Sequence, residues 1–300
     1  MVRIRLFLLL LLILNYPLSA ANILSDSSAM HRQRLAAFIG SSTVIYTGAM
    51  VGLNTLWYKD YPRSSFHFIN DNRQWMQIDK GGHFFSSYYL SILGIQGLRW
   101  AGIDQKKATY WGGLFGFICM TPIEILDGFS DNWGASWGDL ILNTSGSVFA
   151  IGQFLLWNEQ RFLFKLSYFP SIYAPMRPDE FGTNLPSKLF KDYNGHTFWM
   201  SIPFNTILPG KNFMPDWLCI SFGYGADEVL GGTKRTTPIE FMEYNPYRQF
   251  YISFDINTLN IKTKSRALKY LLIATSLIKF PAPAIEFNGS KNTRFHLLYF

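Results

Sequence analysis

The spacing of apolar and polar residues changes part-way along the chain. Four uncharged stretches come first, at 35–58, 83–98, 108–123 and 140–158. The first and last are long enough to span a bilayer, which takes about 20 residues, and the middle two are near the lower limit of about 17. Glycine and serine recur in the third and fourth stretches, and such small residues let helices approach closely. The pattern predicts one unit of four helices.

Alternation replaces helical spacing after residue 166, where prolines also become frequent. Segments 218–224 and 250–256 place apolar side chains at every second position, which is typical of strands. A short helix is expected at 267–278 and a last strand at 294–300. The aromatic ending is similar to the last strand of outer-membrane barrels, but an autonomous barrel needs at least about eight strands. We therefore expect a small sheet docked on the helical unit.

The amino-terminal residues have the layout of a cleavable secretory signal. Two arginines precede the apolar run 6–14, and small residues follow it up to Ala20 and Ala21. A basic start, a short apolar run and small residues are the parts of such a signal, with an uncleaved anchor as the alternative. No cysteine follows the run, so a lipid anchor on a new amino-terminal cysteine is not expected.

Together these patterns predict a mainly α protein of the cell envelope. We expect a signal peptide at 1–21, a helical bundle carrying a polar site at 30–165 and a smaller β-rich region at 166–300. The bundle is expected to be antiparallel, membrane-associated and built from about four helices. The bias of lysine and arginine between the connections runs against the usual orientation rule, so inner and outer membrane both stay open.

Composition narrows the classes of partner. Aromatic residues make up 17% of the chain and charged residues only 16%, which favours a membrane or envelope protein over a cytosolic enzyme. The net charge of +7 comes from scattered residues without a basic helix, so we expect membrane lipid and no nucleic acid as partner. Protein partners are left undetermined. Cys119 and Cys219 are expected to be buried free thiols, with a disulfide as the alternative.

Three groups of polar residues lie at the ends of the apolar stretches. Short connections make neighbouring helices antiparallel, so the start of the second stretch, the end of the third and the start of the fourth should share one end of the unit. Within the groups, side chains three or four positions apart fall on one helical face. The expected ligand-binding residues are Asp79, Lys80, His83, Glu124, Asp127, Ser136, Asp139 and Asn143.

Each of these residues also has an ordinary structural interpretation. Asp79 and Asp139 suit the dipole at the first turn of a helix. Lys80 would extend its amino group toward water, and Ser136 is a good helix N-cap. Several ionisable groups gathered at one apolar end nevertheless indicate a shared site or a buried polar network.

Two kinds of chemistry fit the site. His83 is a candidate acid or base with Asp79 or Glu124 orienting it, and a divalent metal is the cofactor considered. No nucleophile elbow surrounds Ser136, so a binding or structural role toward a lipid headgroup or envelope component is preferred. A metal- or His/carboxylate-dependent hydrolase of lipid or glycan is the alternative. The candidate metal ligands are His83, Glu124, Asp127 and Asp139.

The order of these motifs resembles the YfiM-like family of predicted envelope lipoproteins, which have a domain of unknown function. The match runs over 79–146, and the whole layout looks like the extended version of Bacteroidetes-type bacteria. The helical pattern is also similar to VanZ-like membrane proteins, although Asp127 stands where those more usually have Gln. The resemblance implies an envelope location and a family site without established chemistry. The motif residues are Asp79, Lys80, His83, Glu124, Asp127, Ser136, Asp139 and Asn143.

Overall fold

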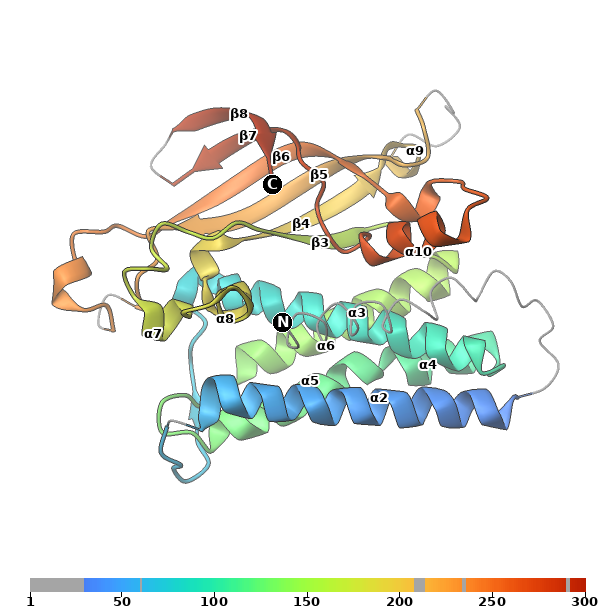
Figure 1. Ribbon diagram of the computed structural model, residues 1–300, viewed down its shortest axis with the longest axis horizontal. Helices are drawn as coiled ribbons and strands as arrows, with labels where there is room; N and C mark the ends of the chain where they lie inside the picture. The colour runs from blue at the N-terminus through green and yellow to red at the C-terminus, as the bar shows by residue number, and fades with distance from the viewer. Residues whose placement is uncertain (1–29, 60, 208–213, 234–235, 290–291) are drawn as a thin grey trace. The chain divides into compact units, whose positions relative to one another are not determined.

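The computed structural model describes residues 30–59, 61–207, 214–233, 236–289 and 292–300 (Figure 1). The chain divides into two compact units. One consists of residues up to 71 together with 82–160, and the other of 72–81 together with 161–300. The expected signal peptide at 1–21 lies outside the described residues.

Helices make up most of the first unit. A single π-helical turn, η1, extends the first of them, and the two-residue strands β1 and β2 pair in parallel beside the helices. Residues 78–81 of α3 belong to the second unit. The elements are α2 (Arg32–Leu53), η1 (Asn54–Tyr58), β1 (Phe68–Ile69), α3 (Ile78–Trp100), α4 (Gln105–Gly113), α5 (Phe115–Gly128), β2 (Ala135–Ser136) and α6 (Trp137–Trp157).

Small residues hold the helices of the first unit together. A Cβ atom on Gly116 of α5 would lie 2.0 Å from the carbonyl oxygen of Ser87 in α3, so only glycine permits this approach. At the same crossing, the Ser147 hydroxyl of α6 lies 2.9 Å from the hydroxyls of Ser87 and Ser91. These bonds give the buried hydroxyl groups the hydrogen-bond partners that polar groups need in an apolar core.

The third apolar stretch forms two helices instead of the single one expected. α4 ends at Gly113 and α5 begins at Phe115. A Cβ atom on Gly113 would lie 2.1 Å from the Ile151 side chain of α6. A Cβ atom on Gly112 would likewise lie too close to the backbone of α3. Two consecutive glycines give close packing at the cost of helix propensity, and the break falls directly after them.

The second unit is built on a six-stranded antiparallel sheet. Its strands pair in the order in which they occur in the chain (Figure 1). The strands are β3 (Leu163–Tyr168), β4 (His196–Pro203), β5 (Leu218–Asp227), β6 (Tyr247–Ile256), β7 (Ala282–Asn288) and β8 (Thr293–Tyr299).

The second unit also contains short helices and 3₁₀ turns. One of them, η2, directly precedes α3, whereas the others lie between the strands, such as α10 between β6 and β7. These elements are η2 (Gln74–Gln77), α7 (Pro178–Phe181), α8 (Leu185–Lys191), η3 (Tyr193–Gly195), α9 (Phe204–Ile207), η4 (Ile239–Phe241), η5 (Thr258–Asn260) and α10 (Arg266–Ala274).

The prediction of a mainly α protein, with a membrane-associated bundle of about four helices and a smaller β-rich region, is wrong. The described residues contain a large six-stranded sheet, and helices occur in both units. The alternating segments predicted as strands lie in β5 and β6, whereas β3, β4 and β7 were missed. β4 ends in proline and β7 follows one, so their composition favoured a loop, and cross-strand pairing decided otherwise.

Membrane association of the helices is not shown. α2 and α6 are long and apolar enough to cross a membrane, by length and composition. α6 buries polar residues, among them Asn143 and Ser147, whereas Ile141, Val148 and Leu156 are exposed. The prediction of two buried free thiols is confirmed, because Cys119 and Cys219 are both buried and unpaired.

Candidate functional site

Three helices of the first unit bring two carboxylates to one imidazole. His83, in the second turn of α3, has its Nδ1 atom 3.5 Å from Oε1 of Glu124 on α5. Its Nε2 atom lies 3.7 Å from Oδ1 of Asp139 on α6. The side chain of His83 is 13% exposed, whereas Glu124 and Asp139 are almost wholly buried. We call His83, Glu124 and Asp139 the acidic histidine cluster.

The start of α6 explains why Asp139 and Glu124 are held so firmly. Ser136 is the N-cap of α6, and its hydroxyl oxygen accepts the Asp139 backbone N–H at 3.2 Å. The same hydroxyl donates to Asp71 at 2.5 Å, and the Ser136 backbone N–H donates to Oε2 of Glu124 at 3.2 Å. The Ser136 side chain therefore caps α6, and its backbone N–H links the start of α6 to Glu124 of α5.

Asn143 closes the apolar side of the cluster, one turn after Asp139. Its Oδ1 atom lies 3.1 Å from Nδ1 of His83, and its side chain is completely buried. Its backbone carbonyl accepts the Ser87 hydroxyl. Because an amide oxygen accepts only, this contact favours the tautomer that carries its proton on Nδ1, with Nε2 facing Asp139.

Glu124 has hydrogen-bonding capacity that the described residues do not use. Its Oε1 atom makes no hydrogen bond to any described residue, and the residue is 2% exposed. Burial raises the pKa of Glu124 to about 8, with a further rise from Asp139 and an opposing effect of His83. A buried carboxylate without a full set of donors is costly, so such groups commonly mark sites that do something.

Asp127 lies outside the acidic histidine cluster. Tyr58, at the end of η1, donates its hydroxyl proton to Oδ1 of Asp127 at 2.7 Å. Burial and the nearby Asp127 carboxylate raise the pKa of Tyr58. The Trp133 ring packs edge-on against Tyr58. Asp127 therefore belongs with Tyr58 and Trp133, outside the cluster.

Asp79 and Lys80 lie at the start of α3, in the segment that belongs to the second unit. They form an ion pair at 3.6 Å, and the Tyr193 hydroxyl donates to Asp79 at 3.1 Å. Asp79 also precedes His83 by one helical turn, which places both on one face of α3.

The backbone before Asp79 is strained. Trp75, Met76 and Gln77 have positive φ values of 49°, 49° and 62°, which side chains other than glycine rarely adopt. The Tyr224 hydroxyl donates to the Met76 carbonyl, and Arg248 donates to Gln77 at 2.6 Å. Strained backbone persists only where its surroundings fix it, and here it sets the direction in which α3 begins.

Sequence reasoning missed two residues that support the site. Asp71, which accepts the Ser136 hydroxyl, lies in a connection without periodicity, and nothing in the sequence marks it. Ser87, which binds the Asn143 carbonyl, had a detectable signal, because it lies one turn after His83 on the same face of α3.

The comparisons with known proteins give one match. Residues 68–155 match the family model described as predicted periplasmic lipoprotein (DUF2279). The match supports an uncharacterised periplasmic or envelope lipoprotein family, and with it a cell-envelope location. The matched range contains the acidic histidine cluster, Asp79 and Ser136. No curated protein and no solved structure matches the chain.

Proposed function

We propose that this envelope protein binds a divalent cation at the acidic histidine cluster. The observation that carries the proposal is the placement of a largely buried imidazole between two buried carboxylates, with Oε1 of Glu124 making no hydrogen bond in the described part of the chain. Imidazole together with carboxylate oxygens is a ligand set that Zn²⁺ and other first-row divalent cations accept.

The spacing of the atoms assigns a role to each member. Nε2 of His83 and Oδ1 of Asp139 are 3.7 Å apart, a separation that suits two ligands of one ion at about 2.0–2.2 Å from each. Nδ1 faces Glu124 and Asn143 on the other side of the ring. Metal-binding histidines usually donate from their second nitrogen to a carboxylate or carbonyl oxygen, which orients the ring.

The charge of the site favours a cation over an anionic group. Two carboxylates repel a phosphate at close range, and they attract a positive charge more strongly where water is excluded. The preferred role as a binding protein is thereby narrowed from a lipid headgroup in general to a cationic ligand. The proposal also includes the similarity of this chain to YfiM-like and VanZ-like proteins.

A hydrolase of lipid or glycan is a weaker proposal. The Ser136 hydroxyl caps α6 and donates to Asp71, so it is not a candidate nucleophile. Hydrolysis would depend on water activated by the same cation. Cation binding is therefore the step to test first.

Calorimetric titration of the chelator-treated full-length protein with Zn²⁺, Mn²⁺ and Ca²⁺ tests the proposal. We expect saturable binding of one cation per chain, and loss of that binding in His83→Ala and Asp139→Asn. Glu124→Gln should weaken the affinity by about 10–100-fold, as changes to groups that orient a metal ligand do.

His31→Ala is the matched control, because His31 is exposed and bonds Ala101 and Leu35 through its backbone. Circular dichroism spectra establish that each variant is folded, and His83→Asn replaces His83→Ala if the latter does not fold. A wild-type protein that binds none of the three cations contradicts the proposal, as does equal loss in the His31→Ala control.

A further inference from the structure

The sheet of the second unit buries polar side chains on one face and exposes apolar side chains on the other. Most water-soluble sheets show the reverse. Along β6, Tyr251, Ser253 and Asp255 are buried. Phe250 and Phe254, on the opposite face of the same strand, are 51% and 52% exposed. Polar residues thus fill the interior, and aromatic residues face outward.

The interior polar groups bind one another. Lys165 of β3 forms an ion pair with Asp255 at 2.9 Å, and both side chains are wholly buried. At the other side of the sheet, His296 of β8 contacts Glu286 of β7 at 2.7 Å. The Lys279 ammonium lies 4.9 Å from the centroid of the Trp199 ring. The concave interior is therefore a satisfied polar network.

The outward face is continuous across four strands. Phe222, Ile252, Ile285 and Phe295 are direct cross-strand neighbours and form one row over β5, β6, β7 and β8. All of them are at least 39% exposed, and no charged side chain interrupts the row. The exposed apolar residues of this face are Phe222, Phe250, Ile252, Phe254, Ile285, Phe287, Phe295 and Leu297.

In water this arrangement is unfavourable on both faces. Burying Lys165 and Asp255 costs desolvation of two charges, and exposing phenylalanines forgoes the free energy of apolar burial. Next to lipid both features are ordinary, because strands that face hydrocarbon place apolar side chains outward and polar side chains inward. A contiguous apolar face of this size also marks a surface for membrane or protein contact.

Basic residues border the apolar face at both ends. Arg248, two residues before Phe250 on β6 and therefore on the same face, is exposed at one end. The chain that follows the other end of β6 carries exposed Lys262, Lys264 and Arg266. Positive charge beside an apolar surface complements anionic phospholipid headgroups and not the apolar surface of a second protein.

We infer that the outward face of β5 to β8 docks on the surface of an anionic phospholipid bilayer. The phenylalanines enter the acyl boundary, and the bordering lysines and arginines contact headgroup phosphates. This assignment concerns the second unit and is independent of cation binding by the first.

Flotation of the full-length protein with vesicles tests the inference. Vesicles of phosphatidylcholine alone are compared with vesicles containing phosphatidylcholine and phosphatidylglycerol in equal amounts. We expect binding to the anionic vesicles, weaker binding at high salt, and a loss of about tenfold or more in the Phe254→Asp/Phe295→Asp double variant. Each change removes an exposed phenyl group that docking would bury in the bilayer.

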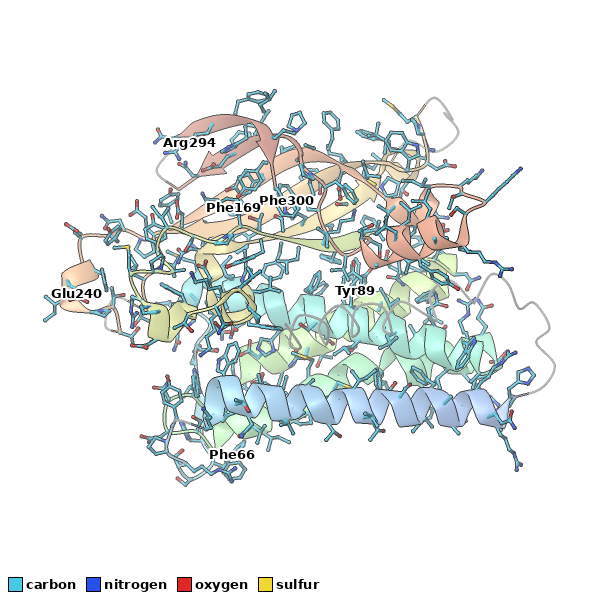
Figure 2. The ribbon with its side chains drawn as sticks, in the orientation of Figure 1. Phe66, Tyr89, Phe169, Glu240, Arg294 and Phe300 are labelled. Carbon is cyan, nitrogen blue, oxygen red and sulfur yellow. The ribbon has the colours of Figure 1, made fainter. Side chains whose placement is uncertain are left out.

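Ile239→Asp/Ile172→Asp is the matched control. Both isoleucines are more than three-quarters exposed and lie outside the strands. In Figure 2, Glu240 marks η4, which carries Ile239 and lies away from the sheet. The control should bind vesicles as the wild type does, and circular dichroism checks that all variants are folded.

Sedimentation velocity supplies the opposing outcome. If the wild type is a dimer that does not float with vesicles, and the Phe254→Asp/Phe295→Asp variant is a monomer, the face binds a second copy and the inference is overturned. Equal flotation of the wild type and of this variant overturns it as well.

Discussion

The two units treat a buried carboxylate in opposite ways. In the sheet, Asp255 accepts from Lys165 at 2.9 Å, from Ser201 at 2.6 Å and from the Phe280 backbone N–H at 3.1 Å. In the helical unit, Glu124 accepts one backbone N–H, and its second oxygen has no hydrogen bond among the described residues. Both residues are about equally buried, at 1% and 2% exposure.

The contrast separates a structural acid from a candidate functional one. A buried carboxylate that is fully paired specifies the packing of its surroundings and is costly to disturb. One that is incompletely paired destabilises the fold, so its presence requires another explanation, such as a ligand. Burial alone therefore does not identify a site, whereas unused hydrogen-bonding capacity does.

The largest expected effect comes from removing the charge of Asp255. Asp255→Asn leaves Lys165 buried without its counter-charge, which should lower the free energy of unfolding by about 3–5 kcal/mol. Glu124→Gln is the same chemical change in the helical unit and should leave the stability unchanged or increase it. Urea unfolding followed by circular dichroism measures both.

Adding Lys165→Met to Asp255→Asn removes both charges, and the Asn side chain keeps one oxygen that accepts from either Ser201 or the Phe280 backbone N–H. The double variant should recover part of the lost stability. Equal losses in Asp255→Asn and Glu124→Gln would show that the two carboxylates do not differ in the way described.

A smaller effect is expected from the glycines that join the helices. Gly116→Ala would place a methyl group 2.0 Å from the Ser87 carbonyl oxygen, and the resulting displacement should cost about 1–3 kcal/mol. It should also weaken cation binding, because α5 carries Glu124. Thermal unfolding and the calorimetric titration measure the two effects.

Gly152→Ala on α6 is the control, because a Cβ atom there has no neighbour within 4 Å. Alanine is the better helix former, so this variant should gain about 0.5–1 kcal/mol. A loss of stability in Gly152→Ala similar to that in Gly116→Ala would mean that the close crossing of α3 and α5 is not what the glycine serves.

The last expected effect concerns pH. The pKa of Glu124 is raised from 4.5 to about 8 in the folded chain, so the folded state binds more protons than the unfolded state between these values. The stabilisation from its protonated form is complete below about pH 4.5 and is lost as the pH rises toward 8. The Glu124→Gln variant has no titrating group at this position, so it does not lose stability in this way.

The stability of Glu124→Gln relative to wild type should therefore increase between about pH 5 and pH 8, by about 3–4 kcal/mol. Urea unfolding across this range, in the presence of a chelator, measures the difference. A difference that stays constant with pH would place the titration of Glu124 below the range and contradict the assignment.

Residue spacing predicted part of the candidate site. The i,i+4 relations of Asp79 with His83 and of Asp139 with Asn143 follow from helical geometry, as does Ser136 as the N-cap of α6. The separation of Asp127 from the cluster could not be predicted, because it depends on Tyr58 from another helix. Asp71 could not be predicted either, since it lies in an irregular connection.

The fold was predictable only in part, for a related reason. Apolar periodicity located α2, α3 and α6, and alternation located β5 and β6. The break between α4 and α5 depends on how closely α3 and α6 approach Gly112 and Gly113, which only packed helices reveal. Strands β3, β4 and β7 depend on their neighbours for pairing, and local propensity does not contain that information.

The sequence by itself determined which segments are helical or alternating and which ionisable residues lie at their ends, because these are local properties of spacing and capping. Only the tertiary structure decided that His83 lies between Glu124 and Asp139, and that the aromatic residues of the sheet face outward over a polar interior. A strand has two faces that alternate in the same way, so its sequence cannot tell which one is buried, and contacts with distant residues make that choice.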